Sequence, residues 1–187
     1  MKGNGESLTG QLLVAAPALR ESTFERAVVL MLSHDDDGAL GVVVNNPTDV
    51  PVADVLPGWS PVVSEPDVVF QGGPVSLDSA LGLVSIDGRD EPLGIRRVRG
   101  RLGVVDLDTP TEIVLPAVTA MRVFAGYAGW APEQLEAEID EGSWYVVDAE
   151  PFDAFRLHTT DLWQTVLRRQ SGPLALMASF PDDPSLN

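Results

Sequence analysis

The sequence has 187 residues, of which 44% are hydrophobic and 21% are charged, and it contains no cysteine. This composition is typical of one globular domain over residues 1–187, and it excludes disulfides, thiolate metal ligands and thiol nucleophiles. The formal net charge of -16 opposes binding to nucleic acid and to anionic membranes, and no apolar run reaches the roughly 20 residues of a membrane-spanning helix. We therefore expect a cytoplasmic protein whose residues 1–7 and 181–187 are loose ends.

Three apolar segments open the chain, at residues 12–15, 27–33 and 40–45. Each is short and rich in valine and leucine, which is typical of strands. The last two are joined by residues 34–38, which end in Asp37-Gly38, a pair that supplies the backbone conformation of a tight hairpin turn. Because these strands show almost no polar alternation, we predict that both faces of the hairpin are buried and that it is central to the fold.

The rest of the chain is mainly strands with a few inserted helices. We expect short helices around residues 54–56 and after Thr109, which is followed by Pro110 and Glu112 as in a capping box. Longer helices are predicted over 133–141, with Leu135 and Ile139 facing the core, and over 161–170, capped by Thr160. Strands are predicted at 67–71, 80–86, 98–107, 122–127 and 144–147. This order lacks a regular strand-helix-strand alternation and predicts an α+β fold with a largely antiparallel or mixed sheet.

Arginines concentrate in one place in this acidic chain, at residues 96–101. If residues 98–102 form a strand, then Arg97, Arg99 and Arg101 project to one face. Such a face would be solvated and paired with the abundant carboxylates, or it would form a small anion site for a phosphate or carboxylate. The charge balance of the whole chain makes direct binding of nucleic acid by this patch the less favoured hypothesis.

The familiar catalytic and phosphate-binding motifs do not occur in the sequence. The two histidines are His34 and His158. His34 begins the segment His34-Asp35-Asp36-Asp37-Gly38, but adjacent aspartates do not have the alternating spacing of a calcium loop, so a solvated turn is favoured over a metal site. We predict no bound metal and no cofactor.

Three further features have both a structural and a functional interpretation. Gly72-Gly73-Pro74 follows a predicted strand and forms a sharp turn or an anion-binding backbone nest. Gln134 and Glu138 lie on one face of a predicted helix, where they form a surface hydrogen bond or line a polar pocket. Trp130 is a tryptophan, a residue that more often anchors a hydrophobic core than forms a flat surface for a ligand.

Several separated motifs together resemble those of one known family, the AlgH-like family, also called YqgE. They are Leu13-x-Ala15-x-Pro17-x-Leu19, Phe24 ahead of Val28-Val29, His34-x-x-x-Gly38-Ala39-x-Gly41-x-Val43-Val44-Asn45-x-Pro47, Gly72-Gly73-Pro74, and Gly126-Tyr127-Ala128-Gly129-Trp130 followed by Gln134-Leu135-Glu136-x-Glu138-Ile139 and Trp144. The resemblance implies a small cytoplasmic bacterial protein with a bent sheet that closes toward a pseudo-barrel. It implies no catalytic residues, and the family label of a regulator of alginate synthesis is a proposed role.

Two functions follow as hypotheses. The favoured one is a non-enzymatic binding or regulatory protein that acts through a protein partner or a small ligand, with candidate ligand-binding residues at His34, Asn45, Gly72, Gly73, Trp130, Gln134 and Glu138. The alternative is a hydrolytic or metal-assisted enzyme in which His34, Asp37, Asn45 and Glu138 converge in one cleft.

Overall fold

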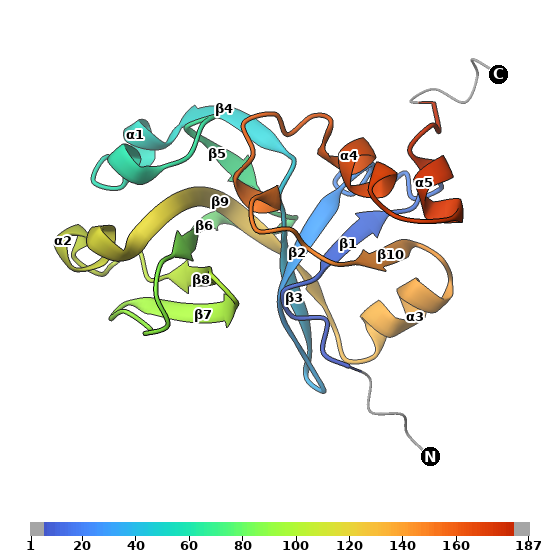
Figure 1. The fold of residues 1–187 in the computed structure, drawn as a ribbon, viewed down its shortest axis with the longest axis horizontal. Helices are drawn as coiled ribbons and strands as arrows, with labels where there is room; N and C mark the ends of the chain where they lie inside the picture. Colours follow the sequence, from blue (N-terminus) through green and yellow to red (C-terminus); the bar gives the residue numbers. More distant parts are fainter. Residues whose placement is uncertain (1–5, 182–187) are drawn as a thin grey trace.

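The computed structural model describes residues 6–181, which form one ten-stranded sheet with short helices around it (Figure 1). The strands are β1 (Leu12–Ala15), β2 (Val28–Asp35), β3 (Gly38–Val43), β4 (Pro47–Pro51), β5 (Val68–Gln71), β6 (Val75–Ile86), β7 (Ile95–Arg99), β8 (Leu102–Val105), β9 (Val118–Trp130) and β10 (Trp144–Val147). The α-helices are α1 (Val52–Val55), α2 (Thr111–Val114), α3 (Gln134–Asp140), α4 (Leu162–Arg168) and α5 (Pro173–Met177), and there are 3-10 turns at Ser60–Val62, Leu115–Ala117 and Asp153–Phe155.

The strands lie in the order β10-β1-β2-β3-β9-β6-β8-β7, and β5 pairs with both β4 and β9 beside this path. All pairs of named strands are antiparallel except β5 with β9, among the residues described. The predicted α+β fold with a largely antiparallel sheet is confirmed. The bent sheet that the family resemblance implies is also confirmed, as a sheet curled into a half-barrel.

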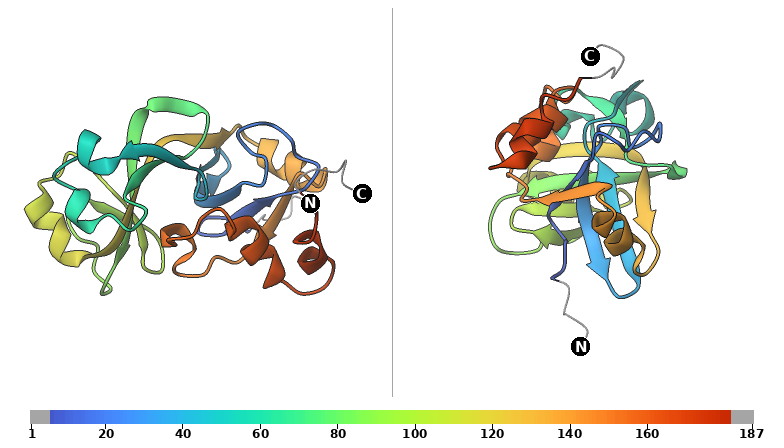
Figure 2. Two further views of the ribbon diagram at one scale, coloured as in Figure 1. Left: turned by 90° about the horizontal axis from the view of Figure 1, so that it is seen from above. Right: turned by 90° about the vertical axis from the view of Figure 1, so that its right-hand side faces the viewer.

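Strand β9 is shared by two lobes. Its first part pairs with β6 and β5, whereas its last residues, Ala128–Trp130, pair with β3. We call the part formed by residues 47–117 the central lobe and the part formed by residues 6–46 and 131–181 the terminal lobe. Figure 2 shows β9 passing from one lobe to the other. The relative position of the two lobes therefore depends on the path of this one strand.

The hairpin of β2 and β3 is buried on both faces, as its unbroken apolar sequence predicts. Along β2, Val28 and Leu30 contribute to one core and Val29 and Met31 to the other, because successive side chains of a strand point to opposite faces. Helices α4 and α5 cover the first face, and α3 covers the second. The turn has two residues between the strands and ends at Gly38, where φ is +128°.

A third core lies in the central lobe. It is formed by side chains of β6, β7, β8 and the first part of β9, closed by α1, α2 and the 3-10 turn at Ser60–Val62. Val52 and Val114, which are fully buried, attach α1 and α2 to this core. The central lobe thus has a hydrophobic core of its own.

Where the lobes meet, β5 and β9 approach so closely that side chains are excluded. A Cβ atom on Gly72 would lie 2.4 Å from the carbonyl oxygen of Gly126, and one on Gly73 would lie 2.1 Å from the carbonyl carbon of Tyr127. Gly126 has a φ of +70°, in the left-handed region that glycine adopts without steric cost. These glycines let β9 bend and change partners.

Arg122 is a buried cation on β9 beside this junction. Its guanidinium donates to the carbonyl oxygens of Arg156 (3.1 Å), Ser64 (3.3 Å) and Glu65 (2.8 Å), and it lies 4.2 Å from the centre of the Phe70 ring. Desolvation by burial lowers the pKa of Arg122 to about 10. Because Ser64 and Glu65 belong to the central lobe and Arg156 to the terminal lobe, this side chain ties the two together.

Several predicted element boundaries are wrong. Residues 98–107 do not form one strand, because the chain turns at Gly100 and Arg101, between β7 and β8. Helix α2 begins one residue later than predicted and has no side-chain cap, since Thr109 packs against Gly94 instead. Helix α4 follows Asp161, also without a side-chain cap, and α5 follows it.

The predicted loose ends lie mostly outside the described residues, which exclude 1–5 and 182–187. Ser7, which was included in that prediction, is attached to the fold, because its hydroxyl donates to the carbonyl oxygen of His34 at 2.9 Å. Within residues 6–181, none of the helices combines the length and the apolar character needed to cross a bilayer.

The substitution Gly73→Ala tests the close approach of β5 and β9. The added Cβ would meet the backbone of Tyr127, which cannot move without displacing β9. We expect the free energy of unfolding, measured by urea denaturation, to fall by about 3 kcal/mol or more. Gly58→Ala is the matched control, because a Cβ there has its nearest neighbour at 3.7 Å and should change stability by less than about 1 kcal/mol. Equal effects of the two substitutions would contradict this account of the junction.

Candidate functional site

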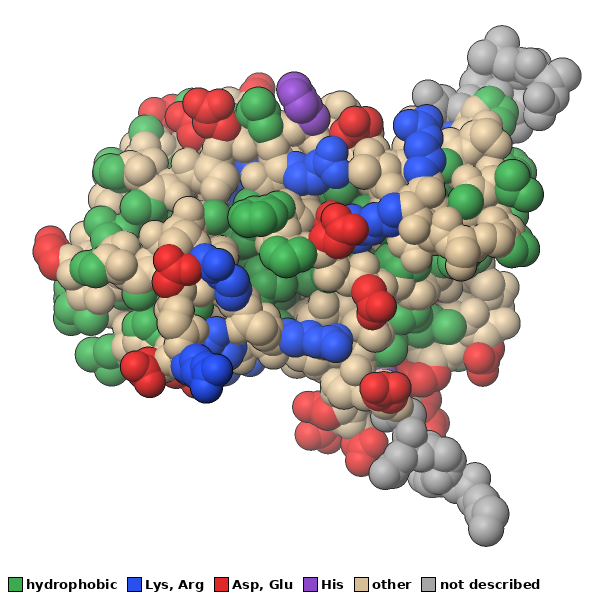
Figure 3. All heavy atoms as spheres, viewed as in Figure 1, with side chains coloured by type: hydrophobic (Ala, Val, Ile, Leu, Met, Phe, Trp, Pro, Cys, Tyr) green, Lys and Arg blue, Asp and Glu red, His purple; other side chains and the backbone are tan. Residues whose placement is uncertain are grey.

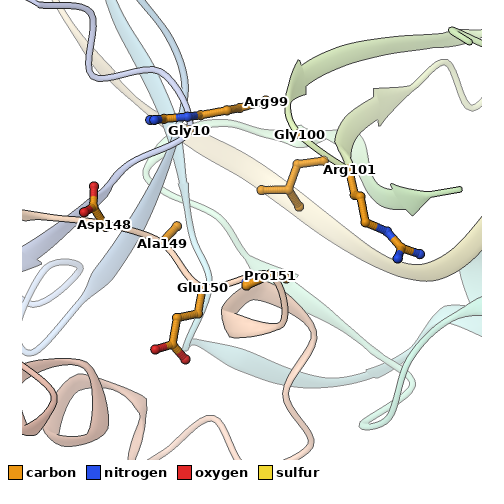
Figure 4. Close-up of a pocket in the computed structure, with 9 residues that line it drawn as sticks. Gly10, Arg99, Gly100, Arg101, Asp148, Ala149, Glu150 and Pro151 are labelled. Carbon is orange, nitrogen blue, oxygen red and sulfur yellow. The ribbon is translucent and has the colours of Figure 1, made fainter. Parts of the chain in front are cut away.

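A cleft of about 420 Å³ lies between the two lobes (Figure 4). One wall is the turn between β7 and β8 in the central lobe, and the other wall is the segment after β10 together with Gly10 in the terminal lobe. The cleft is lined by Gly10, Arg99, Gly100, Arg101, Leu102, Asp148, Ala149, Glu150 and Pro151. Its lining therefore includes two of the three arginines that the sequence singled out and two acidic residues, Asp148 and Glu150.

Two of the three arginines are engaged within the central lobe. The guanidinium of Arg97 donates to the carbonyl oxygens of Gly88 (3.3 Å), Asp90 (2.9 Å) and Gly100, so this side chain closes its own loop. Arg101 forms an ion pair with Asp87, and in Figure 4 its side chain points away from Gly10. The predicted common face of three arginines does not form, because the turn at Gly100 breaks the strand.

Arg99 is different. Its aliphatic stem lies against Gly10, where a Cβ atom would come within 2.4 Å of Cδ of Arg99. Figure 4 shows its guanidinium extended over Gly10 toward the terminal lobe. Within residues 6–181 this guanidinium makes no hydrogen bond or ion pair, although the chain has 28 acidic residues against 12 basic ones.

The opposite wall is held in place by Arg169. This residue makes a two-pronged contact with the buried carboxylate of Asp153 (2.8 and 2.6 Å) and also reaches Glu150 (3.2 Å) and the carbonyl oxygen of Asp148 (3.1 Å). The hydrogen bonds that Arg169 donates to Asp153 raise the pKa of Arg169 above its ordinary value. The carboxylate of Asp148 has no partner among the described residues. Arg99 and Asp148 are thus two oppositely charged side chains of the cleft lining that have no partner within residues 6–181.

A second cluster joins α3 to the sheet through Glu138. The indole N–H groups of Trp130 (2.8 Å) and Trp144 (2.9 Å) both donate to Oε2 of Glu138, and the side-chain amide of Gln134 donates to Oε1 (3.0 Å). The backbone N–H of Ala131 donates to Gln134 Oε1 (3.0 Å). Three of the predicted ligand-binding residues, Trp130, Gln134 and Glu138, are therefore brought together, but their polar groups already satisfy one another. A hollow of about 310 Å³ lies beside them.

His34 contacts Glu136, which lies two residues before Glu138 on α3. Its Nδ1 accepts the backbone N–H of Leu8 (3.1 Å), so this nitrogen carries no proton and Nε2–H donates to Oε1 of Glu136 (2.6 Å). The pKa of Glu136 is lowered, first by a hydrogen bond from its own backbone and then by the hydrogen bond from His34. With both ring nitrogens engaged, His34 has no lone pair left with which to act as a base.

Asn45 and Gly72 are also engaged within the fold. Asn45 accepts the N–H of Val28 (2.9 Å) and donates to the carbonyl oxygen of Arg26 (2.9 Å). The N–H of Gly72 donates to Ala125 (2.9 Å), so it is not available to a bound anion. Asn45 therefore lies beside Val28 at the start of β2, and Val28 is six residues, or roughly 20 Å along the strand, from His34.

The four residues of the enzyme hypothesis are consequently separated. His34 contacts Glu136, Glu138 contacts the two tryptophans, Asp37 lies in the β2–β3 turn and Asn45 lies at the opposite end of that hairpin. No group of three or more histidine or carboxylate side chains within residues 6–181 is arranged to hold a metal ion.

Charge is unevenly distributed over the surface. Figure 3 shows acidic side chains gathered at the lower edge, where Figure 1 places the β2–β3 turn and α3, and basic side chains spread across the middle of this face. Sequence reasoning found the arginines of the cleft but missed Gly10 and the segment 148–151. Nothing in the local sequence marks these residues, because they reach the cleft only through long-range packing.

Comparisons with known proteins agree with the motif resemblance. A family model described as AlgH-like matches residues 12–175. A UPF0301 protein from Streptomyces coelicolor is 59% identical over 185 residues, covering 97% of this chain and 96% of the relative. The crystal structure of a Corynebacterium diphtheriae protein has a TM-score of 0.88 at 36% identity, covering 96% of this chain and 95% of that chain. The solution structure of the AlgH protein from Pseudomonas aeruginosa has a TM-score of 0.68 at 26% identity, covering 98% and 100% of the two chains.

Replacing Glu138 with glutamine tests whether this carboxylate attaches α3 to the sheet. Glu138→Gln leaves one acceptor oxygen for three donors, so we expect a loss of about 1–3 kcal/mol in the free energy of unfolding. In an NMR spectrum, the indole N–H signals of Trp130 and Trp144 should shift, while those of Trp59 and Trp163 should not. Glu141→Gln, at the end of the same helix, should leave stability and all four signals unchanged. The interpretation fails if both variants behave alike.

Proposed function

The chain belongs to the AlgH-like family, and we propose that it is a binding protein that holds a small ligand in the cleft between its lobes without transforming it. The ligand carries a carboxylate or phosphate at one end and an amine or other hydrogen-bond donor at the other. A ligand of this kind would contact both lobes at once, which makes occupancy of the cleft a suitable regulatory signal.

One observation carries this proposal. Arg99 and Asp148 both line this cleft, with the Arg99 side chain reaching over Gly10 toward the lobe that carries Asp148, and neither has a partner within residues 6–181. Their charges are complementary, yet they do not form an ion pair with each other. A ligand with an anionic end and a donor end would satisfy both, since a guanidinium binds carboxylates and phosphates with paired hydrogen bonds and a carboxylate accepts from an amine.

The chemistry of the lining favours binding over turnover. The residues that line the cleft include no histidine, serine, threonine or tyrosine, so they supply neither a hydroxyl nucleophile nor an imidazole base. His34, the histidine of the family motifs, has both ring nitrogens engaged elsewhere in the terminal lobe. The rigid wall formed by Arg169 and Asp153 supports recognition of a fixed ligand shape.

Three matched four-carbon compounds test the proposal. Succinate has two anionic ends, 4-aminobutyrate has one of each charge, and putrescine has two cationic ends. We expect 4-aminobutyrate to bind most tightly, with NMR shift changes at the backbone amides of Gly10, Gly100 and Ala149. Arg99→Gln should weaken this binding about tenfold, whereas Arg96→Gln, an exposed neighbour outside the cleft, should have little effect.

Two results would overturn the proposal. One is an equal loss of binding in both arginine variants, which would indicate general electrostatic attraction. The other is a set of shift changes confined to the hollow beside Trp130 and Glu138, which would place the ligand on the other side of the terminal lobe. Chemical conversion of the bound compound, followed in the proton spectrum, would contradict the non-enzymatic part.

A further inference from the structure

A second surface feature lies in the central lobe, away from the cleft. It is an apolar groove of about 330 Å³ on one face of the sheet, between β4 with α1 on one side and the start of β6 on the other. Its floor includes Val69 of β5 and Val123 and Ala125 of β9, which also belong to the core of the central lobe. The groove is therefore a place where that core remains open.

The rims of the groove expose large apolar side chains. Val50 of β4 is 40% exposed, Val55 of α1 is 53% exposed and Leu77 of β6 is 52% exposed. These three residues belong to different elements and line the same groove. Apolar side chains that gather in this way on a soluble protein mark an interaction surface.

The position of Leu77 results from a bulge in β6. Val75 pairs with Tyr127 and Ala80 pairs with Ala125, so residues 76–79 lie opposite the single residue Gly126. Ser76 has a φ of +50°, which is uncommon for a residue with a side chain and costs about 1 kcal/mol or more. The fold thus keeps a strained segment that places Leu77 on the rim.

The charged residues of the elements that flank the groove, β4, α1 and β6, are all acidic. From Ala27 to Gly88 the chain contains no lysine or arginine. Residues 46–88, which include β4, α1, β5 and β6, contain the acidic residues Asp49, Asp54, Glu65, Asp67, Asp78 and Asp87. Asp78 lines the groove, and Asp54 is next to Val55. A second copy that presented the same surface would bring like charges together, whereas a basic partner would be attracted.

Strand addition at β4 is opposed by the backbone. Pro47 and Pro51 begin and end this strand and cannot donate a hydrogen bond, and the N–H of Val50 already donates to the hydroxyl of Thr48 (3.2 Å). The occupant therefore binds through its side chains and not by extending the sheet.

We propose that this groove binds a basic amphipathic segment of a partner protein. Apolar side chains of that segment enter between Val55 and Leu77, and its lysines or arginines face Asp54 and Asp78. Such a segment combines the two features that the surface complements, an apolar stripe and adjacent positive charge.

A fluorescently labelled helical peptide of leucine and lysine, about 14 residues long with leucine at every third or fourth position, serves as the probe. Its binding is followed by fluorescence anisotropy in about 0.15 M salt. We expect Leu77→Ser and Val55→Ser each to weaken binding about tenfold. Leu93→Ser is the matched control, because Leu93 is 74% exposed but lies outside the groove, and it should have less than about a twofold effect.

Charge is tested in the same assay. Asp78→Asn should weaken binding of the peptide about threefold, and Asp90→Asn, in the loop before β7, should not. The variant Arg99→Gln should bind the peptide as the unchanged protein does, which separates this surface from the cleft between the lobes.

Each of three results would overturn the proposal. The first is an equal loss of affinity in the Leu77 and Leu93 variants. The second is self-association of the protein in sedimentation experiments that Leu77→Ser abolishes, since the occupant would then be a second copy. The third is the absence of NMR shift changes at Val69, Val123 and Ala125 when the peptide is added to the unchanged protein. This last measurement needs no variant and so does not depend on how a variant folds.

Discussion

The arrangement of the whole protein depends on the close backbone contact between the end of β5 and β9. Gly72 and Gly73 remove the side chains that would keep the two strands apart, and Gly126 adopts the backbone conformation that bends β9 at this point. Before the bend β9 belongs to the sheet of the central lobe, and after it β9 pairs with β3 of the terminal lobe. The same bend leaves Gly126 opposite the bulge of β6, so both the cleft between the lobes and the apolar groove trace back to it.

Arg122 strengthens this junction in an unusual way. A buried guanidinium ordinarily requires a carboxylate, but here backbone carbonyl oxygens and the face of Phe70 take that role. Their hydrogen bonds offset only part of the desolvation, which is why the pKa of Arg122 is lowered. The carbonyl groups come from both lobes. The buried guanidinium therefore keeps all of its hydrogen bonds only while the two lobes stay in contact. A carboxylate would neutralise the charge but would join Arg122 to one element only.

Local patterns in the sequence predict the strands and helices well but predict poorly which of them come into contact. The unbroken apolar runs of β1, β2 and β3 predict strands that are covered on both faces, and the spacing of Leu135 and Ile139 predicts the buried side of α3. The partner of His34 could not be predicted, because Glu136 and Glu138 lie on the same short helix and only the packing of α3 on the sheet selects between them. The same limit applies to the arginine patch. The prediction of one common face is wrong because the tight turn at Gly100 depends on how β7 and β8 pair, which local sequence does not specify.

The acidic excess of the chain does not by itself pair its arginines. Although the chain has 28 acidic residues, only some of its arginines form ion pairs within residues 6–181, so the fold decides which are paired. Arg101 and Arg169 are paired in this way, and Arg97 is held by carbonyl groups. Arg99 is kept from Asp148 because its stem is fixed on Gly10 and the segment of Asp148 is fixed by Arg169. Two opposite charges in the lining of one cleft are thus kept apart by contacts that involve neither charge, which is the arrangement that a preorganised ligand site requires.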